Sequence, residues 1–219
     1  MNSNPQDSTS VKKYGLALHT ASRELGLAIS NFDGDSRCQT WNLDRELATH
    51  LHQYLIEFIQ PQTWADLAFI AVAKGPGGFT GTRIGVVTAR TLAQQLDIPI
   101  FAISTLAASA CHSNQKFTCD RDLALQMPAQ RGQLFGAVYS ASQNSGVSVL
   151  FPDTVMTPES WQEKLDNWGN SYQLIEVGSE LGSSVSSVLE LAYLEWQRGS
   201  RPDWSDALPY YGQHPVKGY

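Results

Sequence analysis

The segment that most constrains the fold is a glycine-rich stretch in the first half of the chain. Residues 71–92 read AVAKGPGGFTGTRIGVVTARTL, an apolar run that enters a loop and leaves as a helix. The loop and the helix start comprise Gly75, Pro76, Gly77, Gly78, Phe79, Thr80, Gly81 and Arg83. Glycine permits sharp turns with positive φ, and we predict that Thr80 caps the helix with its hydroxyl. A strand, a glycine loop and a helix N-terminus suit either an anion or a closely packed chain.

The helix predicted after this loop carries almost no side-chain bulk on one face. Gly81, Gly85, Ala89 and Ala93 recur at every fourth residue and therefore share a face. Glycine inside a helix costs up to about 1 kcal/mol relative to alanine, so the pattern favours the close approach of another backbone. Two explanations stay open, which are packing on the chain's own sheet and packing on a helix of a partner protein.

Strands and helices alternate around this segment, as read from apolar periodicity and turn residues. The first half predicts strands at 14–20, 24–31 and 37–41, a helix at 44–60, a strand at 67–73, a helix at 80–96, a strand at 100–103 and a helix at 105–111. After a polar boundary at 114–120, the second half predicts strands at 121–127, 133–139 and 146–151, a helix at 158–165, a strand at 173–177 and a helix at 184–197.

The same order of three strands, helix, strand and helix thus occurs twice, which favours an internal duplication of topology. We expect a disordered polar tail at 1–10, an N-terminal lobe at 11–113 and a smaller C-terminal lobe at 114–219. The final helix, 184–197, is a candidate to pack back on the first lobe.

The composition narrows the class of protein. The net charge is −6 and no cluster of Lys and Arg is present, which argues against a chain that grips nucleic acid alone. Cys38, Cys111 and Cys119 lack the CxxC spacing and indicate reduced thiols in a cytoplasmic protein. No apolar run approaches the length of a membrane-spanning helix, so no membrane association is expected.

The common catalytic and ligand motifs fail on spacing. Lys74 precedes the glycines, so no Walker A loop fits, and Thr80 stands where Gly-x-Gly-x-x-Gly needs its third glycine. His50 and His52 lie two residues apart on a predicted helix and cannot chelate one ion together. We therefore predict no catalytic residue and no metal site. Arg83 is the best single functional candidate, since it could bind an anion or pair with an acidic partner, although a solvated arginine is the more common outcome.

The run GPGGFTGTRIGVVTARTLA, followed by Ser104-Thr105-Leu106, resembles the TsaB (YeaZ) family. The hallmark of that family is Gly-Pro-Gly-Ser-Phe-Thr-Gly-x-Arg-x-Gly, which this chain matches except that Gly78 replaces the serine. The resemblance continues through Arg131-Gly132 to Pro209-Tyr210 and so covers most of the chain.

The resemblance implies an α/β protein with the actin/sugar-kinase/Hsp70-like (ASKHA) fold, which has two ribonuclease-H-like lobes, here with the second reduced. It also implies a non-catalytic accessory subunit that takes part in forming N6-threonylcarbamoyladenosine at position 37 of tRNA. Such a subunit pairs with the catalytic TsaD and the ATPase TsaE, forms homodimers in the absence of TsaD and meets tRNA only through the complex. The subunit by itself is expected to hold no cofactor. Binding of a nucleotide at the junction with the partner is left as an open alternative. The alternative is a stand-alone nucleotide-binding enzyme of the same fold.

Two departures from the family pattern bear on function. His19 and Pro128 stand where the family has aspartates, which argues against independent ATP hydrolysis. The resemblance also implies that the helices at 44–60 and 80–96 meet the partner. The interface residues expected on these helices are Leu47, Leu51, Tyr54, Phe58, Gly81, Gly85, Val86, Ala89 and Ala93.

Overall fold

The computed structural model describes residues 13–116, 121–142 and 146–212, so the predicted disordered tail at 1–10 lies outside the described residues. The first half forms a five-stranded sheet in the order β3-β2-β1-β4-β5. The first three strands pair antiparallel, whereas β1, β4 and β5 run parallel. The strands are β1 (Tyr14–His19), β2 (Glu24–Ser30), β3 (Ser36–Asn42), β4 (Leu67–Ala73) and β5 (Ile100–Ile103).

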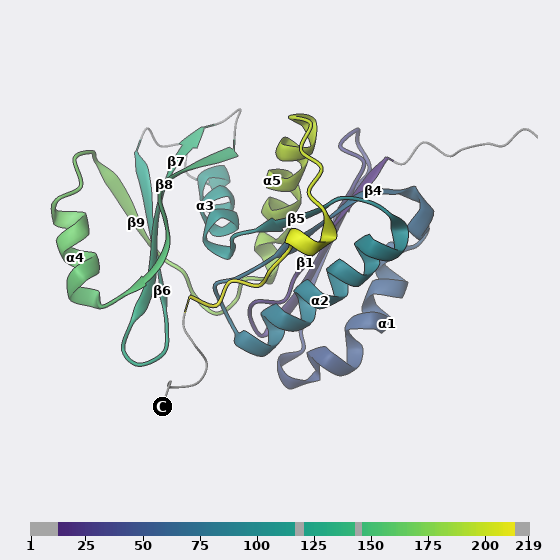
Figure 1. Cartoon of the computed structure of the whole chain (residues 1–219), viewed down its shortest axis with the longest axis horizontal. Coiled ribbons are helices and arrows are strands. Elements are labelled where there is room, and N and C mark those ends of the chain that lie inside the picture. Colours follow the sequence, from purple (N-terminus) through teal and green to yellow (C-terminus); the bar gives the residue numbers. More distant parts are fainter. Residues whose placement is uncertain (1–12, 117–120, 143–145, 213–219) are drawn as a thin grey trace, which may run out of the picture.

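Helices cover both faces of this first sheet (Figure 1). Side chains alternate along a strand, so Leu16 and Leu18 of β1 enter the core formed with α1 (Leu47–Ile59) and α2 (Phe79–Leu96). Ala17 points to the opposite face, where Val188 of α5 (Val185–Gln197) packs. The last helix of the chain therefore lies on the first sheet.

The second half forms a four-stranded sheet in the order β8-β7-β6-β9, which is the order of the first sheet without its fifth strand. Strands β6 and β9 pair parallel, as β1 and β4 do. Helix α4 packs on one face through Trp161 and α3 on the other through Leu106. The bounds are α3 (Thr105–Lys116), β6 (Asp122–Pro128), β7 (Leu134–Ser142), β8 (Gly146–Met156), α4 (Pro158–Asp166) and β9 (Tyr172–Glu176). The predicted fold class, two ribonuclease-H-like lobes with the second reduced, is confirmed.

The predicted elements are present, with differences at their ends. The helix expected at 105–111 continues to Lys116, and the strand expected at 146–151 continues to Met156. The predicted capping role of Thr80 is wrong. Helix α2 begins at Phe79 after Gly78, whose extended backbone makes it the N-cap residue without any side-chain bond. Thr80 lies inside the first turn and is exposed.

Candidate functional site

The glycine loop is clamped between two segments that are distant in sequence. The Gly78 N–H donates to the Ala21 carbonyl at 2.7 Å, and the Tyr210 N–H donates to the Lys74 carbonyl at 2.6 Å. A Cβ at Gly77 would meet the Ala21 carbonyl oxygen. At Gly75, which has a φ of +101°, it would meet the Tyr210 carbonyl oxygen. Both sides of the loop therefore face the chain's own backbone.

The small face of α2 packs on the residue that follows β1. A Cβ at Gly81 would meet the Thr20 carbonyl oxygen, and a Cβ at Gly85 would meet the Thr20 hydroxyl. The Thr20 hydroxyl also donates to the Gly81 carbonyl at 2.8 Å. Farther along the same face, Ala89 and Ala93 are buried in the core under the first sheet. Of the two explanations for the glycine spacing, packing within the chain is the one that the structure supports.

The packing of α1 and α2 corrects the prediction of which residues on these helices meet a partner protein. Those side chains are part of the chain's own core because the apolar arcs of α1 and α2 both turn toward the first sheet. Tyr54 is partly buried against the ring of Trp41, with 4.7 Å between centroids. Gly81 and Gly85 lie against Thr20. The remaining members are buried in the core, namely Leu47, Leu51, Phe58, Val86, Ala89 and Ala93. A partner of α1 and α2 would meet other side chains of these helices.

A cleft of about 1130 Å³ opens in front of the glycine loop, between the two lobes. The rings of Phe79 and Tyr211 pack against each other at one side, tilted by 32° with 4.3 Å between centroids. Arg23 approaches Asp44 to 4.0 Å, but both side chains are mostly exposed, so this ion pair contributes little to stability. The lining residues include Ser22, Arg23, Asp44, Arg45, Gly77, Gly78, Phe79, Thr80, Gly81, Met127, Pro128, Phe135, Leu181 and Tyr211. This cleft brings most of the predicted glycine-loop residues to one surface and is the candidate site.

Arg83 is exposed near the start of α2 and is not among the residues that line the cleft. Its predicted role in anion binding stays a prediction.

His19 ends β1 directly behind the loop and is fully buried. Neither ring nitrogen has a hydrogen-bond partner among the described residues. Burial lowers the pKa of His19 to about 4, so the imidazole is neutral near pH 7. It points to the same face as its cross-strand neighbour Gly26, which lies against Gly182 and Val185 before and at the start of α5. The buried ring therefore carries no negative charge near pH 7, unlike the aspartate that the family resemblance implies at this position.

Pro128, the second replaced position, ends β6 and is exposed in the wall of the cleft. Proline has no N–H and no polar side-chain atom. Neither of the two positions where the family has aspartate therefore offers an acidic group to a ligand in the cleft.

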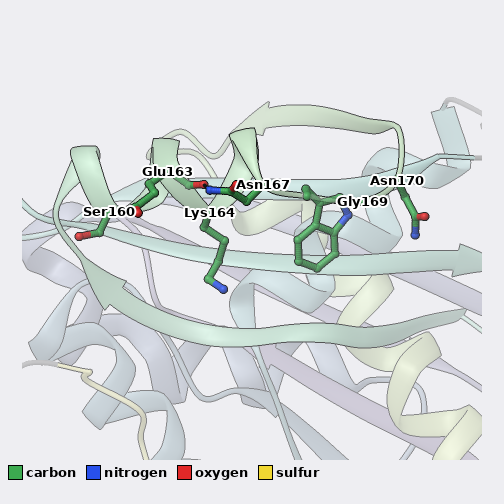
Figure 2. A pocket seen from close by; sticks show the side chains of 7 residues that line it. Ser160, Glu163, Lys164, Asn167, Gly169 and Asn170 are labelled. Atoms are coloured by element: carbon green, nitrogen blue, oxygen red, sulfur yellow. Dashed lines mark hydrogen bonds between the residues drawn. The ribbon is translucent and has the colours of Figure 1, made fainter.

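A second hollow, of about 590 Å³, lies beside α4 in the second lobe. Figure 2 shows Lys164 on the helix, Asn167 directly after its end and Asn170 on the segment that follows. The Lys164 ammonium lies 4.2 Å from the ring centre of Phe151, and Asn170 donates to Asp122 at 3.1 Å. These side chains hold α4 and its following loop against the sheet, so we assign the candidate site to the cleft.

Among the described residues, no three His, Cys, Asp or Glu side chains gather closely enough to hold a metal ion. In the same part of the chain, no helix combines the length and the apolar character that crossing a bilayer requires.

Several cleft residues were not predicted from the sequence. Phe135, Leu181 and Tyr211 come from β7, from the segment before α5 and from the C-terminal segment. They share no local motif with the glycine loop, so no spacing rule connects them. The nearest signal was Pro209-Tyr210, which stands next to Tyr211.

Comparison with known sequences finds relatives that are named as proteins of tRNA modification. Residues 47–173, more than half of the chain, match the family model described as TsaD, tRNA N6-adenosine threonylcarbamoyltransferase. The tRNA threonylcarbamoyladenosine biosynthesis protein TsaB of Bacillus subtilis (strain 168) is 40% identical over 100 residues, which are 46% of this chain and 42% of that protein. The protein of the same name from Escherichia coli (strain K12) is 28% identical over 185 residues, 80% of this chain and 77% of that protein. The chain therefore spans under half of the Bacillus protein and over three quarters of the Escherichia protein.

Solved structures agree with the fold. YeaZ from Pseudomonas aeruginosa superimposes with a TM-score of 0.75 at 21% sequence identity, covering 90% of this chain and 100% of that chain. At this identity the match bears on the fold alone. The family model over more than half of the chain, the sequence matches to TsaB proteins and the GPGGFTGTR run point to the same family. The chain belongs to the TsaB (YeaZ) family.

Proposed function

We propose that the chain is an accessory, non-catalytic subunit for forming N6-threonylcarbamoyladenosine in tRNA in the cytoplasm. It works with the catalytic TsaD and the ATPase TsaE, and tRNA reaches it only through the complex. Family membership supports the pathway. The observation that carries the non-catalytic role is the buried neutral His19 behind a glycine loop that is packed on both sides. The glycine loop and the start of α2 pack on Ala21, Tyr210 and Thr20 of the chain itself.

The proposed docking surface is the exposed face of α1 and α2. Ile56 on α1 is 56% exposed and Val87 on α2 is 53% exposed, and the two helices contact each other. Phe79, at the start of α2, is 36% exposed. Exposed large apolar side chains on two adjacent helices are compatible with a protein–protein contact. The same surface would pair two copies of this chain when TsaD is absent, and a nucleotide would bind, if at all, at the junction with TsaD.

The test is to mix the purified chain with TsaD from the same cell and to measure the mass of the complex in solution. The measurement is repeated with nucleotide and with TsaE. We expect a heterodimer that Val87→Asp or Ile56→Asp weakens at least tenfold, because either change buries an unpaired carboxylate. Val149→Asp is the matched control, since Val149 is 61% exposed but lies on β8 of the second lobe. Failure to form any complex at micromolar concentrations would contradict the proposal.

The alternative, a stand-alone nucleotide-binding enzyme, is tested on the isolated chain. Sustained ATP turnover that Arg83→Ala abolishes would favour it over the accessory role. We expect no turnover above that of a preparation without the protein.

A further inference from the structure

The two lobes also meet at a polar junction centred on Asp153 of β8. Asp153 belongs to the second sheet, whereas Ser104 follows β5 of the first sheet. The Ser104 hydroxyl donates to Oδ2 of Asp153 at 2.5 Å, and the Tyr139 hydroxyl of β7 donates to Oδ1 at 2.5 Å. Both carboxylate oxygens thus accept a hydroxyl, one from each lobe.

The C-terminal segment makes a third connection to the same residue. The Tyr210 hydroxyl donates to the backbone carbonyl of Asp153 at 2.7 Å. The Tyr210 N–H donates to the carbonyl of Lys74, the residue before the glycine loop, at 2.6 Å. Tyr210 therefore ties the glycine loop of the first lobe to β8 of the second.

Ser104 occupies the position at which a hinge between the lobes would turn. Strand β5 ends at Ile103 in the first sheet, and α3 begins at Thr105 and packs on the second sheet through Leu106. The Ser104 hydroxyl oxygen also accepts the N–H groups of Leu106 at 3.1 Å and Ala107 at 3.2 Å. Rotation of Ser104 would therefore break both the cap of α3 and the bond to Asp153.

The chemistry of the junction favours persistent bonds. Tyr139 is 1% exposed, and burial, followed by the negative charge of Asp153, raises the pKa of its hydroxyl. The hydroxyl therefore remains a donor at all physiological pH values. Hydrogen bonds to an ionised acceptor are shorter and stronger than neutral ones, and the other two donors reach Asp153 from parts of the chain that lie far away in sequence.

We propose that Ser104, Tyr139, Asp153 and Tyr210 form a latch that holds the two lobes at one fixed angle. The chain then presents its cleft and the exposed faces of α1 and α2 as one rigid body and does not open and close around a ligand. This inference concerns the isolated chain and does not depend on the proposed function or on any partner.

The test measures the distance between the lobes. Spin labels are placed at two exposed helical positions, His52→Cys on α1 and Glu163→Cys on α4, in a Cys38→Ser, Cys119→Ser background. Pulsed electron spin resonance should give one narrow distance distribution for the chain with an intact latch. Asp153→Ala combined with Tyr139→Phe should at least double its width, because the bond from Ser104 to the Asp153 side chain is lost, only the Tyr210 bond to the backbone of residue 153 remains, and no buried tyrosine hydroxyl at position 139 is left unpaired.

Tyr139→Phe alone is the matched control and should keep the narrow distribution, because the bond from Ser104 to Asp153 remains. Tyr210→Phe is a milder second variant that removes only the hydroxyl bond of the C-terminal segment and should broaden the distribution measurably. It decides the question if the double variant does not unfold cooperatively. A broad distribution in the unaltered chain, broadening by the control, or an unchanged distribution in the folded variants would each overturn the proposal.

Discussion

The buried His19 should make the stability of this protein unusually sensitive to mild acid. Its ring is fully buried without a hydrogen-bond partner among the described residues, and burial lowers its pKa to about 4. In the unfolded chain the pKa returns to about 6.5. Below pH 6.5 the unfolded chain therefore binds a proton that the folded chain does not, and this difference favours unfolding.

The size of the effect follows from the two pKa values. The contribution of His19 is fully present above pH 6.5 and is lost as the pH falls toward 4. Between pH 7.5 and pH 5 the free energy of unfolding should fall by about 2 kcal/mol, and by about 3 kcal/mol once the pH is below 4. His19→Leu preserves most of the volume and removes the titrating group, so this part of the acid sensitivity should disappear.

The assay is urea unfolding followed by tryptophan fluorescence at pH 7.5 and pH 5. The difference in free energy between the two pH values should be about 2 kcal/mol smaller for His19→Leu than for the unaltered chain. His52→Leu is the control, because His52 is an exposed histidine on α1 and its loss should leave the difference unchanged. Equal losses in the unaltered chain and in His19→Leu, within about 0.5 kcal/mol, would refute the reasoning.

Two further substitutions test the packing around α2 and α1 by denaturant unfolding. Gly85→Ala should destabilise by about 1–3 kcal/mol despite the better helix propensity of alanine, because the new Cβ would meet the Thr20 hydroxyl. Gly169→Ala is its control, since a Cβ there has no neighbour within 4 Å; equal effects would contradict the packing argument. Arg37→Met should cost about 2 kcal/mol, because the Arg37 guanidinium donates to three carbonyls at the end of α1 at 2.7–2.9 Å. Arg45 is exposed, so Arg45→Met should leave the free energy of unfolding nearly unchanged. A comparable loss of stability in this control would show that removing any positive charge, and not the loss of the Arg37 hydrogen bonds, causes the effect.

The sequence was sufficient for the elements and the fold class. Apolar periodicity, turn residues and the repeated order of strands and helices are local signals, and the structure has the predicted elements in that order. The prediction that Thr80 caps α2 is wrong, although it rests on a local sequence rule. A loop rich in glycine offers several places for a helix to start, and the chain starts it after Gly78.

The candidate site was only half predictable. The glycine-loop residues were identified from their spacing, and those from Gly77 to Gly81 line the cleft, whereas Gly75, Pro76 and Arg83 do not. The opposite wall, with Phe135 and Leu181, comes from the second lobe, and nothing in its local sequence distinguishes those residues from ordinary core positions. The apolar face of α1 was predicted as a contact surface, and the structure shows that the contact is with the chain's own sheet.

The sequence by itself determined the glycine loop, the helix with one face of glycine and alanine, and the repeated order of strands and helices. Each of these depends on residues that lie close together in the chain. Only the tertiary structure decided what these features touch. Thr20 bonds to Gly81 across 61 positions, and Ser104 to Asp153 across 49. Such pairs form when sheets and helices stack, and periodicity within one element does not specify which residue another element will bring against it. The same stacking buries His19 beneath α5 and makes a neutral ring of a residue that would otherwise titrate near neutral pH.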